Sequence, residues 1–566
     1  MVVFSQFIMK ILCTFTCNIL IWLSSLPSYI KFFFASRHVR AIQEKKLYSI
    51  LKRNKKTIIG LNLNFGAIKT IEDFQKNIPL TDYEFYARYL NQIYGGQTNV
   101  LTRDTIIKLE PTSGTTDPNK YIPYTKKLKK EFQQGIAPWL FNLYNNYPKI
   151  LKGKSYWSIT PSLPCNDKSS VVPIGFEEDS EYFGFFKKWL FKKIFAAPEE
   201  LAKIHDINVW RHFTALFLLK EKNLTLISIW NPTFLTLLLD YIKKNHKKLI
   251  QNIERGGSPD CIDNKNVLYK ILSKKNKRFR KRARELDKIF TKKPKNLWEK
   301  IWPHLTVISC WGDANAKIYF KDLKQYFPNV AIQPKGLIAT EGFISFPIIG
   351  KNGCALSIYS HFFEFIEPDS PNVVLPANQI KVGKKYLVII TTNGGLYRYR
   401  LNDIIKVVGY INQCPLIQFC GKNSLISDMF GEKISAGFVL SALNTLFIKF
   451  NLHPEFFVVA PEYDEKLKTY FYCLFLKLRD NCQNQLYANL SLDLENELQK
   501  NFHYRYCRQL KQLDESKIFV IKNNQKQILS IFLEDGCQLG QKLGNIKPPI
   551  ISKQLGWSKK LSGYFI

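Results

Sequence analysis

Hydroxyl groups and one lysine are concentrated near residue 115, in a segment that could bind phosphate. It holds four hydroxyl side chains, a glycine and, four residues later, a lysine: Thr112, Ser113, Gly114, Thr115, Thr116 and Lys120. Backbone N–H and side-chain O–H groups donate to phosphate oxygens, the lysine supplies charge, and the glycine lets the backbone approach. The G-x-x-x-x-G-K-S/T spacing of a Walker A loop is absent. We therefore predict a polyphosphate-binding loop of another type, with an ordinary polar turn as the alternative.

A single carboxylate follows a predicted strand in the segment KGLIATEGFISFPI, residues 335–348. Glu341 comes where that strand ends, and open α/β folds bind ligands at this edge of the sheet. Mg²⁺ takes one or two protein carboxylates and completes its coordination with substrate phosphates. Glu341 is therefore our candidate metal ligand, with a turn or helix-capping carboxylate as the alternative.

Arginine, tyrosine and aspartate share a third segment, residues 391–410. After a Gly-Gly turn, a predicted strand carries Arg398 and Arg400 on one face and Tyr397 and Tyr399 on the other. Arginine can neutralise phosphate or carboxylate, and an aspartate such as Asp403 can accept both hydroxyls of a ribose. An exposed hairpin with alternating Arg and Tyr is the alternative.

Two strand-and-helix units have the pattern of a mostly parallel sheet. The apolar runs at residues 224–230 and 305–312 are each followed by a helical pattern, and the second helix leads to a short strand at 329–333. Asn231 and Pro232 can cap and open the first helix. Continuous apolar strands joined by helices are typical of a parallel sheet covered on both faces, so the predicted fold class is α/β.

Length and composition limit both the fold and the partners. A chain of 566 residues predicts two to four domains, and 46% hydrophobic residues can build a sizeable core. The net charge of +36 would favour nucleic acid or an anionic membrane, but the lysines are spread along the whole chain, so we expect no nucleic-acid partner. The twelve cysteines form no C-x-x-C pair, which argues against a zinc site and for a reducing compartment.

The N-terminus contains an apolar segment long enough to cross a bilayer. Residues 11–30 are uncharged and lie between Lys10 and Lys31. The segment is only moderately apolar, because it also contains Thr, Asn, Ser and Pro. We predict a helix that is buried against the body or lies on a membrane, with a bilayer span as the alternative.

The three candidate segments stand in an order and at separations that few families share. TSGTT…KYIPYT, ATEG and LYRYRLND resemble the nucleotide-binding motifs of the auxin-responsive-promoter (Gretchen Hagen) family of acyl-acid amido synthetases, in particular its bacterial members. This family belongs to the acyl-adenylate-forming superfamily. The resemblance also covers ISIWNPTFL and FCGKNSLISDMFGEKI, and it extends from about residue 36 to the end.

The resemblance implies two domains with the acyl-adenylate-forming enzyme fold. A large domain, residues 36–421, would hold mostly parallel sheets flanked by helices and bind ATP and the acyl substrate. A smaller, mobile α+β domain, residues 422–566, would follow, and the apolar segment 1–35 would precede both. The pattern after residue 421 agrees with this expectation, since it predicts helix 434–450, strands 455–460 and 468–477, helix 484–502 and strand 517–521.

The resemblance also implies the reaction. A carboxylic acid attacks the α-phosphorus of ATP with Mg²⁺ present, pyrophosphate leaves, and an amine, expected to be an amino acid, attacks the acyl-adenylate. Lys547 matches the lysine of the family's Lys-x-Pro-Arg pattern, although the arginine is absent. The predicted catalytic residues are Lys547, Glu341 and Lys120, with Glu341 also the metal ligand. The predicted nucleotide-binding residues are Thr112, Ser113, Gly114, Thr115, Thr116, Thr340, Tyr399, Arg400 and Asp403.

Three positions depart from the family's motifs. Asp117 follows the hydroxyl-rich loop where a glycine is usual, and its charge would repel phosphate unless it points outward. Asn402 replaces a glycine before Asp403, which is the mildest change because Asn enters the left-handed backbone region readily. Lys422 stands where an arginine is usual and keeps the charge without the fork.

We therefore expect a cytoplasmic ligase that acts on small molecules, with peripheral membrane contact through its N-terminus. Two other functions stay open. One is an acyl-CoA ligase that forms thioesters. The other is a membrane- or nucleic-acid-associated protein that has lost catalysis.

Overall fold

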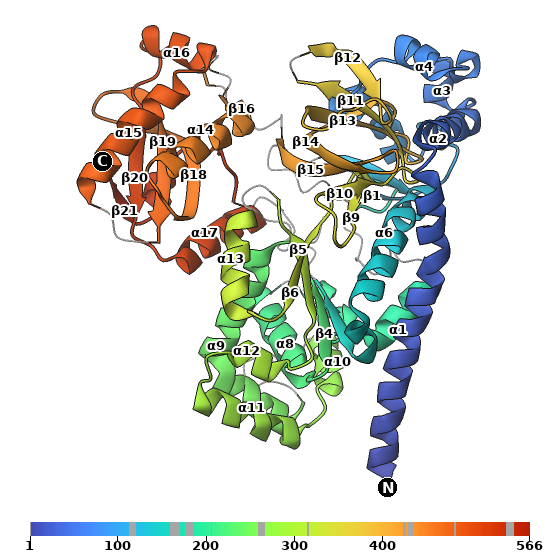
Figure 1. Ribbon diagram of the computed structural model, residues 1–566, viewed down its shortest axis with the longest axis vertical. Coiled ribbons are helices and arrows are strands. Elements are labelled where there is room, and N and C mark those ends of the chain that lie inside the picture. The colour runs from blue at the N-terminus through green and yellow to red at the C-terminus, as the bar shows by residue number, and fades with distance from the viewer. Residues whose placement is uncertain are drawn as a thin grey trace.

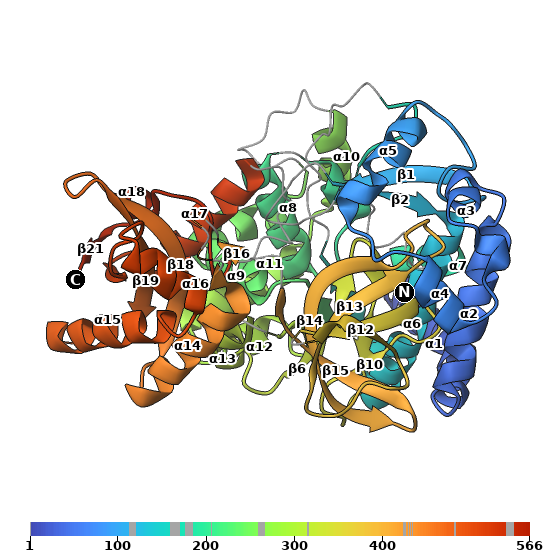
Figure 2. The same ribbon diagram turned by 90° about the horizontal axis from the view of Figure 1, so that it is seen from above.

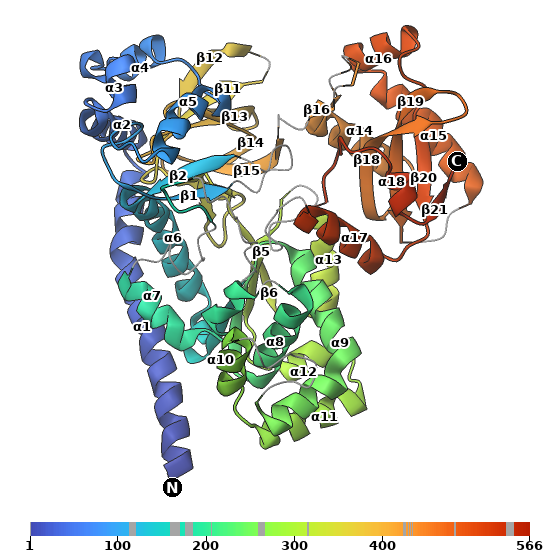
Figure 3. The same ribbon diagram turned by 180° about the vertical axis from the view of Figure 1, so that it is seen from behind.

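The structure is a computed structural model, and its elements form one large body with a smaller group of C-terminal elements to one side (Figures 1, 2 and 3). It describes residues 2–111, 120–158, 170–175, 185–204, 206–257, 267–313, 316–368, 370–422, 426–427, 429–430, 432, 434–479, 483–538 and 548–566.

Helices dominate the first 150 residues. The elements are α1 (Val2–Ala35), α2 (Val39–Asn54), α3 (Ile58–Asn62), η1 (Phe65–Ala67), α4 (Ile71–Asn77), α5 (Tyr83–Tyr94), the hairpin β1 (Ile106–Pro111) and β2 (Tyr121–Thr125), α6 (Lys126–Asn146) and η2 (Pro148–Lys152). Thr125 ends β2 and caps α6, because its hydroxyl accepts the Leu128 N–H at 3.0 Å. Within the described chain, one segment, Leu12–Ala35 of α1, is long and apolar enough to cross a membrane by length and composition.

A four-stranded parallel sheet forms the centre of the next region. Its strands are β3 (Lys154–Trp157), β4 (Leu224–Ser228), β5 (Val307–Trp311) and β6 (Ala331–Lys335), in that order. The surrounding helices are α7 (Phe185–Ile194), η4 (Glu199–Lys203), α8 (Ile207–Lys220), α9 (Pro232–Arg255), α10 (Val267–Lys275), α11 (Arg280–Lys292), α12 (Leu297–Ile301) and α13 (Ala316–Tyr326). All residues of β4 and β5 are buried, which explains why both strands are apolar except at Thr225, Ser228 and Ser309. The predicted cap is confirmed, since the Asn231 side chain accepts the Thr233 N–H.

A second, seven-stranded sheet is antiparallel and was not predicted. Its order is β12-β11-β13-β14-β15-β10-β9. The strands are β9 (Ser345–Pro347), β10 (Cys354–Leu356), β11 (Phe362–Glu367), β12 (Ser370–Pro376), β13 (Lys385–Thr391), β14 (Tyr399–Ile411) and β15 (Cys414–Lys422). The small hairpin of β7 (Ile338–Ala339) and β8 (Gly342–Phe343) connects the parallel sheet to this one.

The C-terminal elements enclose a four-stranded sheet ordered β18-β19-β20-β21. They are β16 (Ile426–Ser427), β17 (Ile434–Ser435), α14 (Ala436–Lys449), β18 (Pro454–Asp464), β19 (Thr469–Leu478), α15 (Asn484–Leu498), α16 (Phe502–Gln509), β20 (Lys517–Ile521), α17 (Gln525–Gln538), α18 (Trp557–Lys560) and β21 (Gly563–Phe565). Alternate residues of β18 belong to two separate cores. Phe457 and Val459 pack with α14 and α15, whereas Phe456 and Val458 pack with α17 and α18.

Candidate active site

Some of the predicted site residues lie in the part of the chain that the structure describes, and the others lie outside it. Thr112, Ser113, Gly114, Thr115, Thr116 and Lys547 lie outside the described residues, as does Asp117. Lys120, Thr340, Glu341, Tyr399, Arg400 and Asp403 lie within them.

Thr340 and Glu341 form the tip of the β7–β8 hairpin, since Ala339 pairs with Gly342 on either side of them. The hairpin is attached to the strand that follows the hydroxyl-rich loop, because the Tyr124 hydroxyl of β2 donates to the Thr340 carbonyl at 2.7 Å. The first and second motifs are therefore adjacent in the structure, as their proposed shared ligand requires.

Asp403 and Lys422 lie opposite each other on β14 and β15. The Lys422 Nζ is 3.4 Å from Asp403 Oδ1, and the carboxylate is buried while the lysine side chain is 43% exposed. The charge of Asp403, reinforced by that of Glu341, raises the pKa of the Lys422 ammonium although burial acts in the opposite direction. Lys422 is therefore charged at neutral pH and faces both carboxylates.

Glu341 is electrostatically coupled to the other motifs. Burial raises the pKa of the Glu341 carboxyl and the charge of Asp403 raises it further, while Lys422 and Lys120 lower it. Lys120 also lies 5.5 Å from the centre of the Tyr83 ring. Glu341 of the second motif is thus influenced by Lys120 of the first motif, Asp403 of the third motif and Lys422 of β15. Such an arrangement can hold a cation and phosphate oxygens together.

The predicted alternation of arginines and tyrosines is wrong at Arg398. That residue has φ +49° and precedes β14, which begins at Tyr399. The Arg398 guanidinium is buried, 3.1 Å from two oxygens of Glu364, and donates to the Ile78 carbonyl at 2.6 Å. Arg398 is thus an internal ion-pair residue that shares no face with the exposed Arg400.

The side chains of Tyr399 and Arg400, which are adjacent in β14, lie in different environments. Tyr399 is buried beside the Tyr86 ring, and its burial and the charge of Glu341 raise the pKa of its hydroxyl. The Arg400 backbone N–H donates to the Thr81 carbonyl at 2.9 Å, while its side chain is exposed. The strand therefore presents a neutral phenol next to Glu341 and an arginine toward solvent.

Asn402 has the left-handed conformation that the sequence predicts, with φ +59°. It lies where the pairing of β13 and β14 slips, since Ile389 pairs with Arg400 but Leu387 pairs with Ile404. The extra residues form a bulge in β14 immediately before Asp403. The bulge explains why this position favours Gly or Asn and how Asp403 is directed inward.

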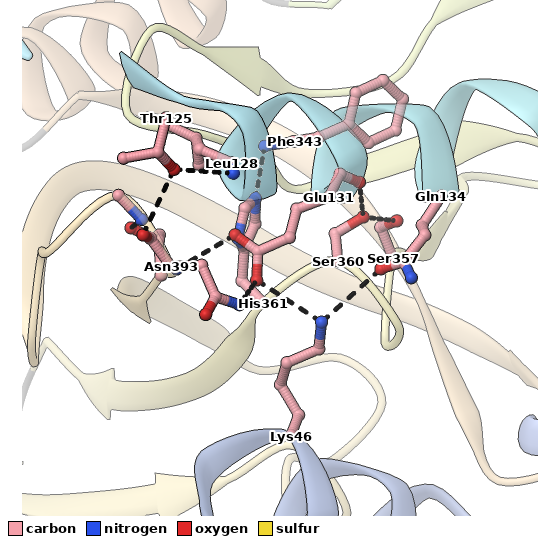
Figure 4. A network of polar contacts seen from close by, with 12 residues as sticks. Lys46, Thr125, Leu128, Glu131, Gln134, Phe343, Ser357, Ser360, His361 and Asn393 are labelled. Atoms are coloured by element: carbon pink, nitrogen blue, oxygen red, sulfur yellow. Dashed lines mark hydrogen bonds and ion pairs between the residues drawn. The ribbon is translucent and has the colours of Figure 1, made fainter. Parts of the chain in front are cut away.

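A buried polar cluster behind these motifs was missed from the sequence, and we call it the Glu131 hub (Figure 4). Glu131 Oε1 accepts from Asn393 Nδ2 at 2.6 Å and lies 3.4 Å from Lys46 Nζ. Its Oε2 accepts from the Asn393 backbone N–H at 3.1 Å and lies 3.2 Å from His361 Nδ1. Although burial alone would raise the pKa of Glu131, Lys46, His361 and Asn393 bring it below the ordinary value.

The Glu131 hub holds the three motifs in register. His361 Nε2 accepts the Phe343 N–H of the β7–β8 hairpin at 2.9 Å, so the ring has its N–H on Nδ1, which lies 3.2 Å from Glu131 Oε2. Thr125, which ends the first motif, donates to the Asn393 carbonyl at 3.4 Å. Asn393 immediately precedes the Gly-Gly turn of the third motif. One buried carboxylate therefore fixes elements of all three segments.

Close packing reinforces this arrangement. A Cβ atom on Gly135 of α6 would lie 2.1 Å from the Phe343 ring, and one on Gly342 would lie 2.8 Å from His361 Nε2. Glu131 stands at helical spacing with Leu128, which is also buried. A carboxylate on the apolar face of a helix was the sequence signal available for the hub.

Metal binding by protein ligands alone has little support. Among the described residues, no group of three or more His, Cys, Asp or Glu side chains could hold a metal ion. A site with one carboxylate fits Mg²⁺ better than zinc or calcium, because Mg²⁺ commonly keeps water and phosphate ligands.

Comparisons with known proteins agree with this geometry. Residues 30–332 match the GH3 family N-terminal domain, and residues 354–422 match the GH3 family central domain. Indole-3-acetic acid-amido synthetase GH3.3 of Arabidopsis thaliana is 22% identical over 550 residues, covering 89% of each chain. Jasmonoyl–L-amino acid synthetase JAR4 of Nicotiana attenuata is 23% identical over 421 residues, covering 68% of this chain and 70% of that protein.

The fold also matches a solved structure of the same kind. The AtGH3.15 acyl acid amido synthetase in complex with 2,4-DB aligns with a TM-score of 0.79 and 19% identity, covering 93% of this chain and 94% of that one. The α/β fold class and the family resemblance inferred from the three motifs are confirmed. The two family domains together cover more than half of the sequence, and the chain belongs to the GH3 family.

Proposed function

We propose that the protein is an ATP-dependent acyl-acid amido synthetase, a ligase that joins a carboxylic acid to an amino acid. The observation that carries the proposal is the mutual placement of Glu341, Asp403 and Lys120, which come from the three motifs, with Lys422 of β15 lying 3.4 Å from Asp403. The relatives support the reaction class, since their names describe the joining of an acid to an amino group.

The reaction has two steps. In the first, a carboxylate oxygen of the acid attacks the α-phosphorus of ATP, and pyrophosphate leaves with the electrons of the broken P–O bond. In the second, the amine attacks the acyl carbon, AMP leaves, and the amine loses a proton. The first step gathers negative charge at the phosphates, so its rate depends on fixed positive groups nearby.

Each described residue has an assigned role in this proposal. Asp403 accepts hydrogen bonds from the ribose hydroxyls, and Glu341 holds Mg²⁺, which would neutralise phosphate charge when bound. Lys120 and Lys422 offset further phosphate charge. Tyr399 lines the site beside Glu341, the backbone of Thr340 orients the hairpin, and Arg400 offers its guanidinium from the exposed side of β14.

The remaining assignments depend on the family resemblance. Residues 112–116 cradle the phosphates, and Lys547 approaches them when residues 422–566 swing as a domain onto residues 36–421. A cytoplasmic enzyme is expected, because the twelve cysteines form no C-x-x-C pair, which argues for a reducing compartment. Contact of the N-terminal helix with a membrane is a separate proposal, because it does not depend on the reaction.

Acid-dependent exchange between ATP and labelled pyrophosphate tests the first step. A panel of carboxylic acids should contain members that support exchange with Mg²⁺, and product analysis should then find an amide when amino acids are added. A thioester formed from coenzyme A, with no amide, would identify an acyl-CoA ligase instead. No exchange with any acid, together with salt-sensitive binding to nucleic acid, would favour the noncatalytic alternative.

A further inference from the structure

Helix α1 has one buried face and one exposed apolar face along its described side chains. The buried face consists of Thr14, Cys17, Asn18, Ile21, Ser25, Phe32 and Ala35. The opposite face carries the apolar side chains of Leu12, Leu20, Leu23, Ile30 and Phe34, which are between 39% and 61% exposed, together with the exposed Thr16 and Pro27. The five apolar residues follow helical spacing, so they form one stripe, which we call the outer stripe.

The buried face is bonded to the body of the protein. Asn18 Nδ2 donates to the carbonyls of Leu151 and Gly153 at 3.1 and 2.9 Å, and its Oδ1 accepts from the Tyr144 hydroxyl at 3.0 Å. A bilayer span would have to break these three bonds and place the Asn18 amide in hydrocarbon. The hydrogen bonds therefore favour a helix that stays on the protein and exposes only its outer stripe.

Cationic residues border the stripe near the end of α1. The Arg37 guanidinium lies 5.2 Å from the centre of the Phe33 ring and 5.9 Å from that of the Phe34 ring, and the side chains of Lys31 and Arg37 are exposed. Apolar and aromatic residues flanked by lysine and arginine are typical of helices that lie in a membrane interface.

Acidic residues are absent from this part of the sequence. The first 43 residues contain no Asp or Glu. The charge of this surface is therefore complementary to anionic lipid.

We propose that the outer stripe of α1 and the cationic residues near its C-terminal end rest on the surface of an anionic lipid bilayer. The stripe enters the headgroup region, and Lys31 and Arg37 face the lipid phosphates. This inference is independent of the proposed reaction.

Sedimentation of the purified full-length protein with vesicles tests the proposal. The protein should bind vesicles of phosphatidylcholine and phosphatidylserine, bind pure phosphatidylcholine at least about tenfold less, and be released by high salt or alkaline carbonate. Leu23→Asp should weaken binding about tenfold or more, because it puts a charge in the stripe. The matched control Leu492→Asp, on the 65% exposed Leu492 of α15, should bind like the unchanged protein.

Three results would overturn the proposal. Equal binding by the Leu23→Asp and Leu492→Asp variants would show that the stripe is not the contact. Retention in vesicles after carbonate extraction would indicate a bilayer span. A dimer in solution that Leu23→Asp converts to a monomer, without binding of the unchanged protein to anionic vesicles, would assign the stripe to a second copy of the chain.

Discussion

Replacement of Glu131 by Gln should damage both the stability of the protein and its use of ATP. The partners of the Glu131 carboxylate are all donors: the Asn393 backbone and side-chain amides, the His361 Nδ1 and the Lys46 ammonium. A glutamine has nearly the same size, but whichever way its amide turns, its NH₂ group meets donors. Breaking a buried pair in this way costs about 3–5 kcal/mol. For a cooperative unit of 150–250 residues, this corresponds to a fall in melting temperature of roughly 6–20 °C.

The effect on catalysis follows from what the hub positions. Loss of the Glu131 charge releases His361 from the β7–β8 hairpin and Asn393 from the turn of the third motif. A displacement of about 1 Å in such supports can reduce rates about a hundredfold. We therefore expect kcat/KM for Mg·ATP in pyrophosphate exchange to fall about ten- to a hundredfold, with a large part of the loss in KM.

Glu495→Gln provides a matched control. Glu495 is also a buried carboxylate whose partners all donate, namely Arg508, Gln499, Tyr504 and the Ser516 N–H, but it belongs to the C-terminal core. This variant should lose similar stability and keep its KM for Mg·ATP within about twofold, because distant sites act independently. If both variants changed KM equally, or if Glu131→Gln melted like the unchanged protein, the hub would not position the site.

The pH dependence gives a second check on Glu131. Its pKa in the folded protein lies below the ordinary value of 4.5, so its stabilising contribution is fully present above that pH and is lost as the pH falls through the folded pKa. The difference in unfolding free energy between the unchanged protein and Glu131→Gln should therefore be constant above about pH 4.5 and shrink below it.

The other predictions concern the motif residues directly. Glu341→Ala should lower Mg²⁺-dependent turnover about a hundredfold or more, and normal turnover at limiting Mg²⁺ would contradict its role as metal ligand. Because the pKa of Glu341 is raised, exchange at limiting Mg²⁺ should decline as the pH falls toward that pKa, and Lys422→Met should move this decline to higher pH. Asp403→Ala should raise KM for ATP more than that for the acid and reduce discrimination against 2′-deoxy-ATP, whereas equal loss with both nucleotides would remove the ribose assignment. Lys547→Ala should lower adenylate formation about a hundredfold while leaving amide formation from supplied acyl-adenylate nearly intact, and parallel loss of both steps would make Lys547 a structural residue.

Local sequence patterns predicted those elements whose conformation is determined by residues nearby in the sequence. The continuous apolar run at 224–230 contains β4, and the cap at Asn231 and Pro232 begins α9. The turn preference of Asn402 predicted its positive φ. In each case a property of one short segment decides the conformation, so a single sequence contains the information.

Features that depend on distant partners were not predictable in this way. The alternation of Arg and Tyr suggested a strand that includes Arg398. The Arg398 side chain instead bonds to Glu364, which lies 34 residues earlier in the chain, and the strand begins after it. The antiparallel sheet places β10 beside β15, a pairing that no local period specifies. The Glu131 hub likewise unites side chains from four separate segments, each of which looks ordinary alone.

The residues of the Glu131 hub are far apart in the sequence, which affects how the protein folds while it is being synthesised. Glu131 is 85 residues from Lys46 and 262 residues from Asn393. A ribosome-bound chain that ends before Asn393 contains all four strands of the parallel sheet and both earlier motifs, yet its Glu131 carboxylate lacks the amides that hold the third segment. We therefore expect ATP to bind only after the strand that follows the Gly-Gly turn has left the ribosome. Binding of ATP would then not stabilise the N-terminal part of the chain while it is being synthesised.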